Sequence, residues 1–304
     1  MDARATTLET AGPLDLALTL APLAHGRFDP TFRRTADGAV WRTTRTADGP
    51  VTCRFVQASP HHVHVAAWGP GAVAALADAP ELLGARDDPA SFEPTLDLLR
   101  TAHRRHAGLR MVRTGRVLEA LVPAVLEQRV VLRGAHDAWR RLLVQHGDPA
   151  PGPAPDGMRV PPDARGWLAV PSWDFHRAGV DPRRARTVTE CARVAARLEE
   201  AVTMAPEQAR ARLQLVPGVG VWTAAETAQR ALGDADAVSV GDYHLAGQVG
   251  WALVGRTVDD AGMLELLEPY RPHRHRVVRL LHLSGAARVP RRGPRLAVQD
   301  HRRG

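Results

Sequence analysis

The stretch Leu213-Gln-Leu-Val-Pro-Gly-Val-Gly-Val-Trp-Thr-Ala224, followed by Val238-Ser-Val-Gly-Asp-Tyr-His-Leu245, decides the fold. It predicts a helix over 206–213, a turn at Pro217-Gly-Val-Gly220 and an alanine-rich helix from about Val221. Two glycines around one apolar residue favour a tight turn, because glycine adopts backbone angles that other residues avoid. The second helix then begins with unpaired backbone N–H groups, which together with the helix dipole attract an anion.

Asp242 follows Trp222 by 20 positions and stands between Gly241 and a new apolar segment. Taken alone, the residue pattern favours a helix cap, a position that suits aspartate. The pattern Leu-x-x-Val-Pro-Gly-Val-Gly-x-Trp-Thr-Ala with the later Gly-Asp-Tyr resembles the helix-hairpin-helix DNA glycosylases, in particular the DNA-3-methyladenine glycosylase II branch. The resemblance implies a hairpin that grips the DNA backbone and a catalytic role for Asp242. A hairpin used only for non-specific DNA binding is the alternative.

Residues 117–130 also resemble this family, although Glu127 stands where the family motif Gly-Gln-x-Val has glycine. The resemblance implies that the residue after Gln128 fills the gap left by a flipped base. Arg129 holds this position, and a phosphate contact is its alternative role. The implied DNA-binding residues are Gln128, Arg129, Pro217, Gly218, Gly220 and Thr223. The backbone carbonyls of Gln214, Val216 and Val219 are implied ligands of a monovalent cation, and no cofactor is expected to be required.

The chain contains no lysine, so all 40 residues counted as Lys or Arg are arginine. Glycosylases that also cleave the strand attack the sugar with an amine and pass through a Schiff base. In the lyase members of the family that lysine lies on the second hairpin helix, in the region where this chain has Trp222. We therefore expect water to be the nucleophile and an intact abasic strand to be the product.

Breaking a purine glycosidic bond builds positive charge on the sugar, which a nearby carboxylate stabilises. The expected base pocket consists of Trp222, Glu226, Tyr243 and Ser284. The face of Trp222 suits a cationic base, a contact worth roughly 0.5–2 kcal/mol. Glu226 lies one helical turn further on and has three open roles: attracting a cationic base, accepting a hydrogen bond from a neutral base, or facing solvent.

These residues predict a monofunctional glycosylase for alkylated purines of the 3-methyladenine and 7-methylguanine class. Two alternatives stay open. The same fold would act on hypoxanthine or another neutral base, or the chain would bind distorted DNA without catalysis. The formal net charge of +7 agrees with a polyanionic partner, here double-stranded DNA with damaged bases. Coding bias explains arginine in place of lysine, but it does not require an excess of base over acid.

Only Cys53 and Cys191 are present, too few for the four thiolates of an iron–sulfur cluster, and no spacing is typical of a zinc site. The first residues lack a signal core, and no apolar run reaches the roughly 20 residues that span a membrane. We expect a cytoplasmic monomer.

The predicted fold is α+β. Residues 1–11 are expected to be loose, and 12–88 to form a small antiparallel α/β domain with strands near 14–20, 40–44, 51–56 and 62–65 and a helix over 71–79. Residues 89–286 are expected to form an all-helical domain that contains the hairpin at 213–232, with a loop at 147–162. A basic tail over 287–304 completes the chain.

Overall fold

A five-stranded antiparallel sheet forms the N-terminal part of the computed structural model, which describes residues 3–289. The strand order is β1 (Arg4–Glu9), β5 (His62–Trp68), β4 (Gly49–Ser59), β3 (Val40–Thr46) and β2 (Phe32–Arg34). Helix α2 (Ala72–Leu82) packs on this sheet with buried residues at helical spacing. Alternate residues such as Val51, Phe55 and Val65 are buried beneath it. The predicted α+β class is confirmed.

Two predictions for the first 20 residues were wrong. Residues 1–11 were expected to be loose, but Arg4–Glu9 form strand β1, which pairs with β5 along its whole length. Backbone hydrogen bonds hold this mostly polar edge strand, so apolar alternation does not mark it. Residues 14–20 were expected to be a strand, but they contain helix α1 (Leu16–Leu20). Asp15 caps this helix, and Leu16, Thr19 and Leu20 share its buried face.

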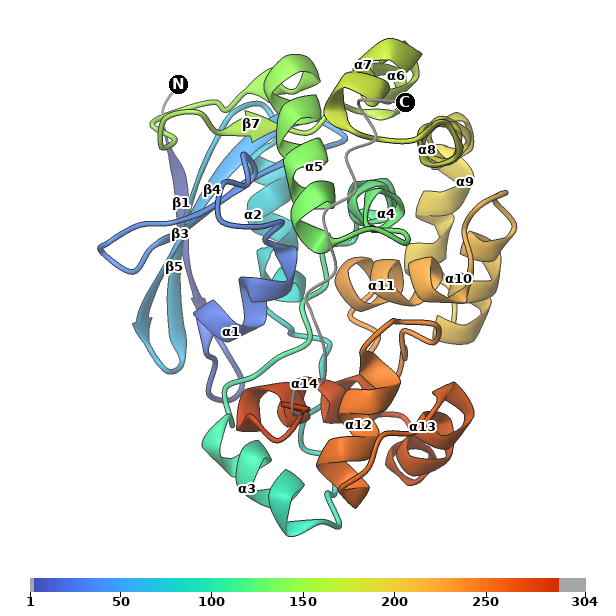
Figure 1. Cartoon of the computed structure of the whole chain (residues 1–304). Coiled ribbons are helices and arrows are strands. Elements are labelled where there is room, and N and C mark those ends of the chain that lie inside the picture. The colour runs from blue at the N-terminus through green and yellow to red at the C-terminus, as the bar shows by residue number, and fades with distance from the viewer. Residues whose placement is uncertain (1–2, 290–304) are drawn as a thin grey trace.

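The helical part surrounds α4 (Val117–Leu126), in which every residue except Glu119 is buried. Around it lie α5 (Leu132–His146), α6 (Ala164–Ala169), α7 (Ser172–Ala178), α8 (Pro182–Arg193), α9 (Ala195–Glu199), η2 (Glu200–Thr203), α10 (Pro206–Gln214) and α11 (Val221–Ala231). Figure 1 shows α4 beside α11, with the sheet on the other side of α5. Glu119 forms an ion pair with Arg42 on β3, which links the helices to the sheet.

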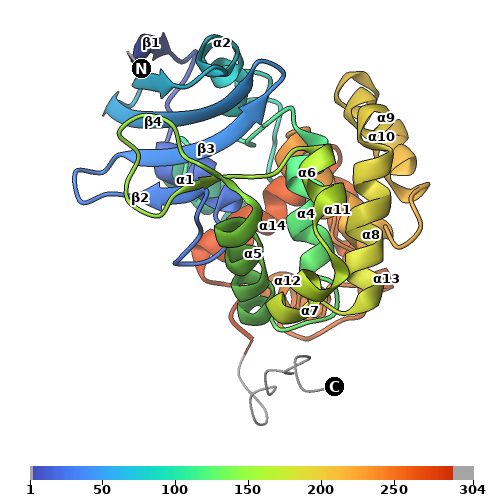
Figure 2. The same ribbon diagram turned by 90° about the horizontal axis from the view of Figure 1, so that it is seen from above.

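A second apolar cluster joins segments that are far apart in sequence. It unites α3 (Asp97–Arg105) with α12 (Leu245–Val254), α13 (Asp260–Leu267), η3 (Glu268–Tyr270) and α14 (Arg274–Ser284). These helices gather at the bottom of Figure 1, and Figure 2 shows the sheet to one side of the helices. The hairpin α10–α11 therefore leads from the α4 core to the α12–α14 group.

The connecting segments contain short regular elements of their own. The predicted loop at 147–162 carries a two-stranded ribbon of β6 (Asp148–Pro149) and β7 (Arg159–Val160), and η1 (Ala21–Leu23) follows α1. Within residues 3–289, no helix combines the length and apolar character needed to cross a membrane. Most of the predicted basic tail, residues 290–304, lies outside the described residues.

Candidate active site

The α10–α11 hairpin turns sharply at Gly218, which has a backbone φ of +92°. A Cβ atom at this position would lie 2.2 Å from the Oγ1 atom of Thr187 on α8. Glycine is therefore required both by the backbone angle and by the close packing of α8. Gly220 differs, because its φ is −92° and no heavy atom lies within 4 Å of an added Cβ.

Helix α11 begins directly after this turn and presents free hydrogen-bond donors. Within residues 3–289, the backbone N–H groups of Val221, Trp222 and Thr223 have no hydrogen-bond partner. Gly220 and Val221 are exposed, so the helix end is open to solvent. Exposed N–H groups at a helix N-terminus, with the positive end of the helix dipole, form a site suited to a phosphate.

The loop between α4 and α5 is tied to this hairpin by Gln128. Its Nε2 atom donates to the carbonyl of Gly218 at 2.9 Å and to Oγ1 of Thr223 at 2.8 Å. The next residue, Arg129, is exposed and has a φ of +54°. Among the described residues it is the one non-glycine residue with a positive φ, a conformation that bulky side chains rarely adopt. The strained loop therefore presents Arg129 to solvent beside the hairpin.

Asp242 uses its two carboxylate oxygens differently. Its Oδ1 atom accepts the backbone N–H groups of His244 at 2.8 Å and Leu245 at 2.9 Å, which caps the start of α12. Its Oδ2 atom accepts the indole N–H of Trp222 at 3.3 Å. Capping and a catalytic role are therefore compatible, because one oxygen holds the helix while the other faces Trp222.

The polar side chains that follow Trp222 along α11 form hydrogen bonds with one another and with neighbouring segments. Glu226 accepts a hydrogen bond from Nη1 of Arg230 at 2.7 Å and another from the hydroxyl of Ser239. The side chains of Glu226 and Arg230 are 15% and 18% exposed, so the ion pair is largely buried. The Nε atom of Arg230 also donates to the carbonyl of Pro22, in the N-terminal part. The charge of Glu226 is therefore balanced within the protein.

Arg279 on α14 has no carboxylate partner among the described residues, and its Nη2 atom donates to the carbonyl of Leu18. Burial lowers the pKa of Arg279 to about 10, and repulsion from Arg230 and Arg276 adds to this effect. Burial, followed by repulsion from Arg279, also lowers the pKa of His282, and Asp242 acts in the opposite direction. Arg279 thus carries a positive charge that no carboxylate among the described residues pairs with.

Several solved structures share this architecture. The 3-methyladenine DNA glycosylase from Archaeoglobus fulgidus superposes with a TM-score of 0.77 at 17% identity, covering 92% of this chain and 98% of the other. The fold is that of the helix-hairpin-helix DNA glycosylases. MBOgg1 bound to a low-affinity DNA ligand gives a TM-score of 0.73 at 13% identity, covering 94% of this chain and 98% of the other. The apo 8-oxoguanine glycosylase/lyase of Clostridium acetobutylicum gives 0.70 at 12% identity, covering 93% and 98%.

By sequence, no protein-family model and no curated protein matches the chain. The solved structures that share this fold include enzymes named for 3-methyladenine and for 8-oxoguanine. At these identities the likeness establishes the fold, and the lesion has to be argued from the side chains of this chain.

Several of the predicted site residues contact one another in the structure. Trp222 contacts Asp242, and Gln128 contacts both Gly218 and Thr223. Pro217 is exposed in the same turn. Gln128 forms hydrogen bonds with the hairpin, and the sequence motif did not indicate these bonds.

Other residues of the predicted base pocket are placed differently. Tyr243 is 78% exposed and packs edge-on against His244, so it lines no enclosed pocket. Ser284 is exposed, and its hydroxyl donates to the carbonyl of Leu281 within the same helix. Glu226 was included in the expected base pocket, and its carboxylate oxygens accept hydrogen bonds from Arg230 and Ser239.

The predicted cation site concerns the backbone carbonyls of Gln214, Val216 and Val219. The Val216 carbonyl accepts the N–H of Val219 at 3.0 Å, which closes the turn. A carbonyl oxygen has a second lone pair, so this bond leaves room for one further ligand. The monovalent cation stays a prediction.

Sequence reasoning missed Arg230, Ser239 and Arg279. Arg230 stands at i+4 from Glu226, a spacing typical of a helical ion pair, so the first of these could have been found. No spacing in the sequence links Ser239 or Arg279 to α11. Ser239 lies in the connection after α11, and Arg279 lies on α14.

Proposed function

We propose that the chain is a DNA glycosylase of base excision repair, which removes a damaged purine and leaves an abasic site. One observation carries the proposal. The Oδ2 atom of Asp242 lies 3.3 Å from Nε1 of Trp222, on the helix whose open N-terminus suits a phosphate. A backbone anchor, a carboxylate and an aromatic face thus meet at one end of one helix.

Asp242 would act on the developing positive charge of the sugar. Its Oδ1 atom is held by two backbone N–H groups, so the carboxylate is fixed before substrate arrives. A preorganised charge stabilises the oxocarbenium-like transition state, and Oδ2 is placed to orient the attacking water. The chain has no lysine to form a Schiff base, so hydrolysis would stop at the abasic site.

The hairpin and the 127–131 loop would hold the DNA. The N–H groups of α11 would bind a backbone phosphate, which positions the duplex without reading its bases. The target base would leave the stack, and Arg129 would fill the gap or contact a phosphate. The Clostridium acetobutylicum 8-oxoguanine glycosylase/lyase has been seen with double-stranded DNA containing cytosine opposite 8-oxoguanine, which supports DNA as the partner in this fold.

Alkylated purines are the first proposed substrate class. Their formal positive charge makes them good leaving groups, which suits a site whose one assigned catalytic group is the carboxylate of Asp242. The face of Trp222 would also favour a cationic base.

A neutral, oxygen-bearing purine is the second candidate, and one observation favours it. Glu226 is already balanced by Arg230, whereas Arg279 has no carboxylate partner among the described residues. An unpaired guanidinium beside the base would repel a cationic base and would donate hydrogen bonds to a carbonyl oxygen. Hypoxanthine and oxidised guanine carry such an oxygen.

A panel of single-lesion duplexes tests the proposal. Each duplex carries 3-methyladenine, 7-methylguanine, hypoxanthine or 8-oxoguanine, and released free base is quantified by chromatography. Release from at least one duplex, with the strand intact until hot alkali, is the expected result. Binding to all duplexes without any release would contradict the proposal and favour a DNA-distortion-binding protein.

A further inference from the structure

We propose that His25, Glu127 and His136 form a binding site for a zinc-class divalent cation. Among the described residues, these three form the one group of His, Cys, Asp or Glu whose ligand atoms all lie within 4.8 Å of one another. Two imidazoles and one carboxylate are a donor set typical of transition metals, whereas Mg²⁺ and Ca²⁺ prefer oxygen ligands. The inference is independent of the proposed glycosylase activity.

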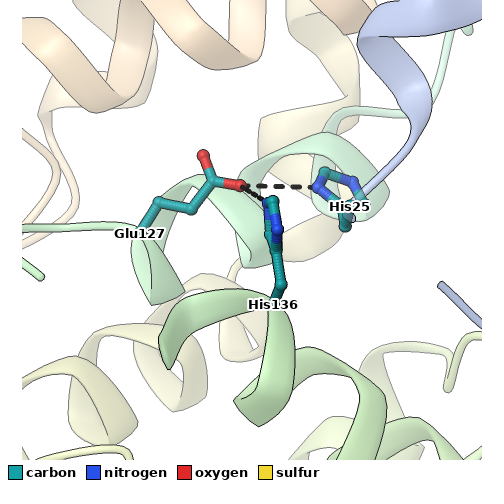
Figure 3. A group of neighbouring side chains, drawn as sticks. All are labelled: His25, Glu127 and His136. Carbon is teal, nitrogen blue, oxygen red and sulfur yellow. Dashed lines mark ion pairs between the residues drawn. The ribbon is translucent and has the colours of Figure 1, made fainter. Parts of the chain in front are cut away.

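The three ligands come from three separate segments. His25 precedes β2, Glu127 follows the last residue of α4, and His136 lies on the second turn of α5. Figure 3 shows both imidazole rings turned toward one carboxylate oxygen of Glu127. Their spacing in the sequence gives no recognisable zinc motif, which explains why the sequence predicted none.

The distances fit a metal better than a direct hydrogen bond. Oε1 of Glu127 lies 3.5 Å from Nδ1 of His25 and 3.7 Å from Nε2 of His136. Both exceed the normal range of about 2.7–3.2 Å for a hydrogen bond. Tetrahedral Zn²⁺ with ligands at about 2.0–2.1 Å separates two ligand atoms by about 3.3 Å, a few tenths of an ångström less than each Glu127–His distance, and the two imidazole nitrogens lie within 4.8 Å of each other.

The surrounding structure holds two of the ligands in place without a metal. Asp29 is buried and accepts the backbone N–H of His25 at 2.7 Å and the indole N–H of Trp139 at 3.0 Å. The His25 ring packs edge-on against Trp139, one helical turn beyond His136 on α5. An added Cβ at Gly26 would lie 2.7 Å from Nδ1 of His136, so glycine makes room for that ring.

The side chains of His25 and Glu127 are 11% exposed and that of His136 is 23% exposed. The site is therefore partly shielded but reachable from solvent. With three protein ligands, water would occupy the fourth position. Cys53 and Cys191 are both buried elsewhere and take no part.

The position of the site suggests what the cation does. Glu127 is directly followed by Gln128 and Arg129, the residues that tie the loop to the hairpin and face solvent beside it. A cation here would fasten this loop to the N-terminal part through His25 and to α5 through His136. It would hold Arg129 in its strained conformation and has no step in bond cleavage.

Zinc titration of the untagged full chain, stripped of metal with a chelator, tests the proposal. Competition against a chromophoric chelator should show one equivalent of Zn²⁺ bound. Co²⁺ in its place should give visible d–d absorption without a thiolate charge-transfer band. Saturating Zn²⁺ should raise the thermal unfolding midpoint, because a ligand that binds only the folded state stabilises it.

Glu127→Gln and His136→Ala should each weaken Zn²⁺ binding by at least about 100-fold, since even outer-shell changes cost 10–100-fold. His61→Ala, at an exposed histidine in the turn between β4 and β5, is the matched control and should bind as the parent chain does. Glu127→Gln is nearly isosteric and carries the test if His136→Ala fails to fold. Absence of one-equivalent binding by the parent chain would overturn the proposal. Unchanged affinity in Glu127→Gln would do so too.

Discussion

Replacing Gly218 by alanine measures how far the hairpin turn depends on one residue. A φ of +92° costs an L-residue about 1–2 kcal/mol. The new Cβ would also lie 2.2 Å from Oγ1 of Thr187, and such overpacking costs typically about 1–3 kcal/mol. We therefore expect Gly218→Ala to lower the free energy of unfolding by about 2–5 kcal/mol, measured by urea denaturation followed by circular dichroism. Adding Thr187→Ala should recover the steric part of this loss.

Gly220→Ala is the matched control, because Gly220 has an ordinary φ of −92° and free space around it. Its free energy of unfolding should fall by no more than about 1 kcal/mol, because Gly220 caps α11 and alanine is a poorer N-cap than glycine. Its affinity for DNA should fall equally for damaged and undamaged duplexes, since the added methyl group stands beside N–H groups that would contact a phosphate. Equal unfolding free energies for the two variants would refute the steric reasoning. A loss confined to damaged DNA would refute the backbone contact.

Three further outcomes are expected. Glu226→Gln should lower the free energy of unfolding by roughly 1–3 kcal/mol, because it leaves the buried Arg230 without its carboxylate; urea denaturation checks this. Borohydride added during turnover should trap no protein–DNA adduct at any residue other than Met1, since the chain has no lysine, and mass spectrometry of the reaction would detect one. Burial raises the pKa of Cys53 to about 11 and of Cys191 to about 12, so at pH 8 iodoacetamide should label neither thiol until the chain is unfolded.

The hairpin and its aspartate could be predicted because local sequence determines them. Gly218 and the cap at Asp242 depend on backbone angles and on hydrogen bonds to residues two or three positions away. Trp222, in the first turn of α11, contacts Asp242 20 positions later, and only the family resemblance, not local sequence, assigned both residues to one site.

What could not be predicted depends on contacts between distant segments. Glu226 was included in the expected base pocket because it stands four residues after Trp222. It also stands four residues before Arg230, and that spacing produces the ion pair seen in the structure. Arg279 on α14 contacts Leu18, and His25 lies beside Glu127 across about 100 positions of sequence, so neither contact could be predicted from spacing. The strand predicted for residues 14–20 was wrong for another reason. Alternating leucines over so short a segment fit a capped helix as well as a strand.

Base release by Asp242→Asn tests the central claim most directly. The asparagine oxygen still accepts the N–H groups that begin α12, so the fold should be retained while the negative charge is lost. On the lesion that the parent chain releases fastest, single-turnover release should slow by at least about 10²-fold, with affinity for the same duplex unchanged or tighter. A near-normal rate of release by the folded variant would contradict the assignment of Asp242 and the mechanism built on it.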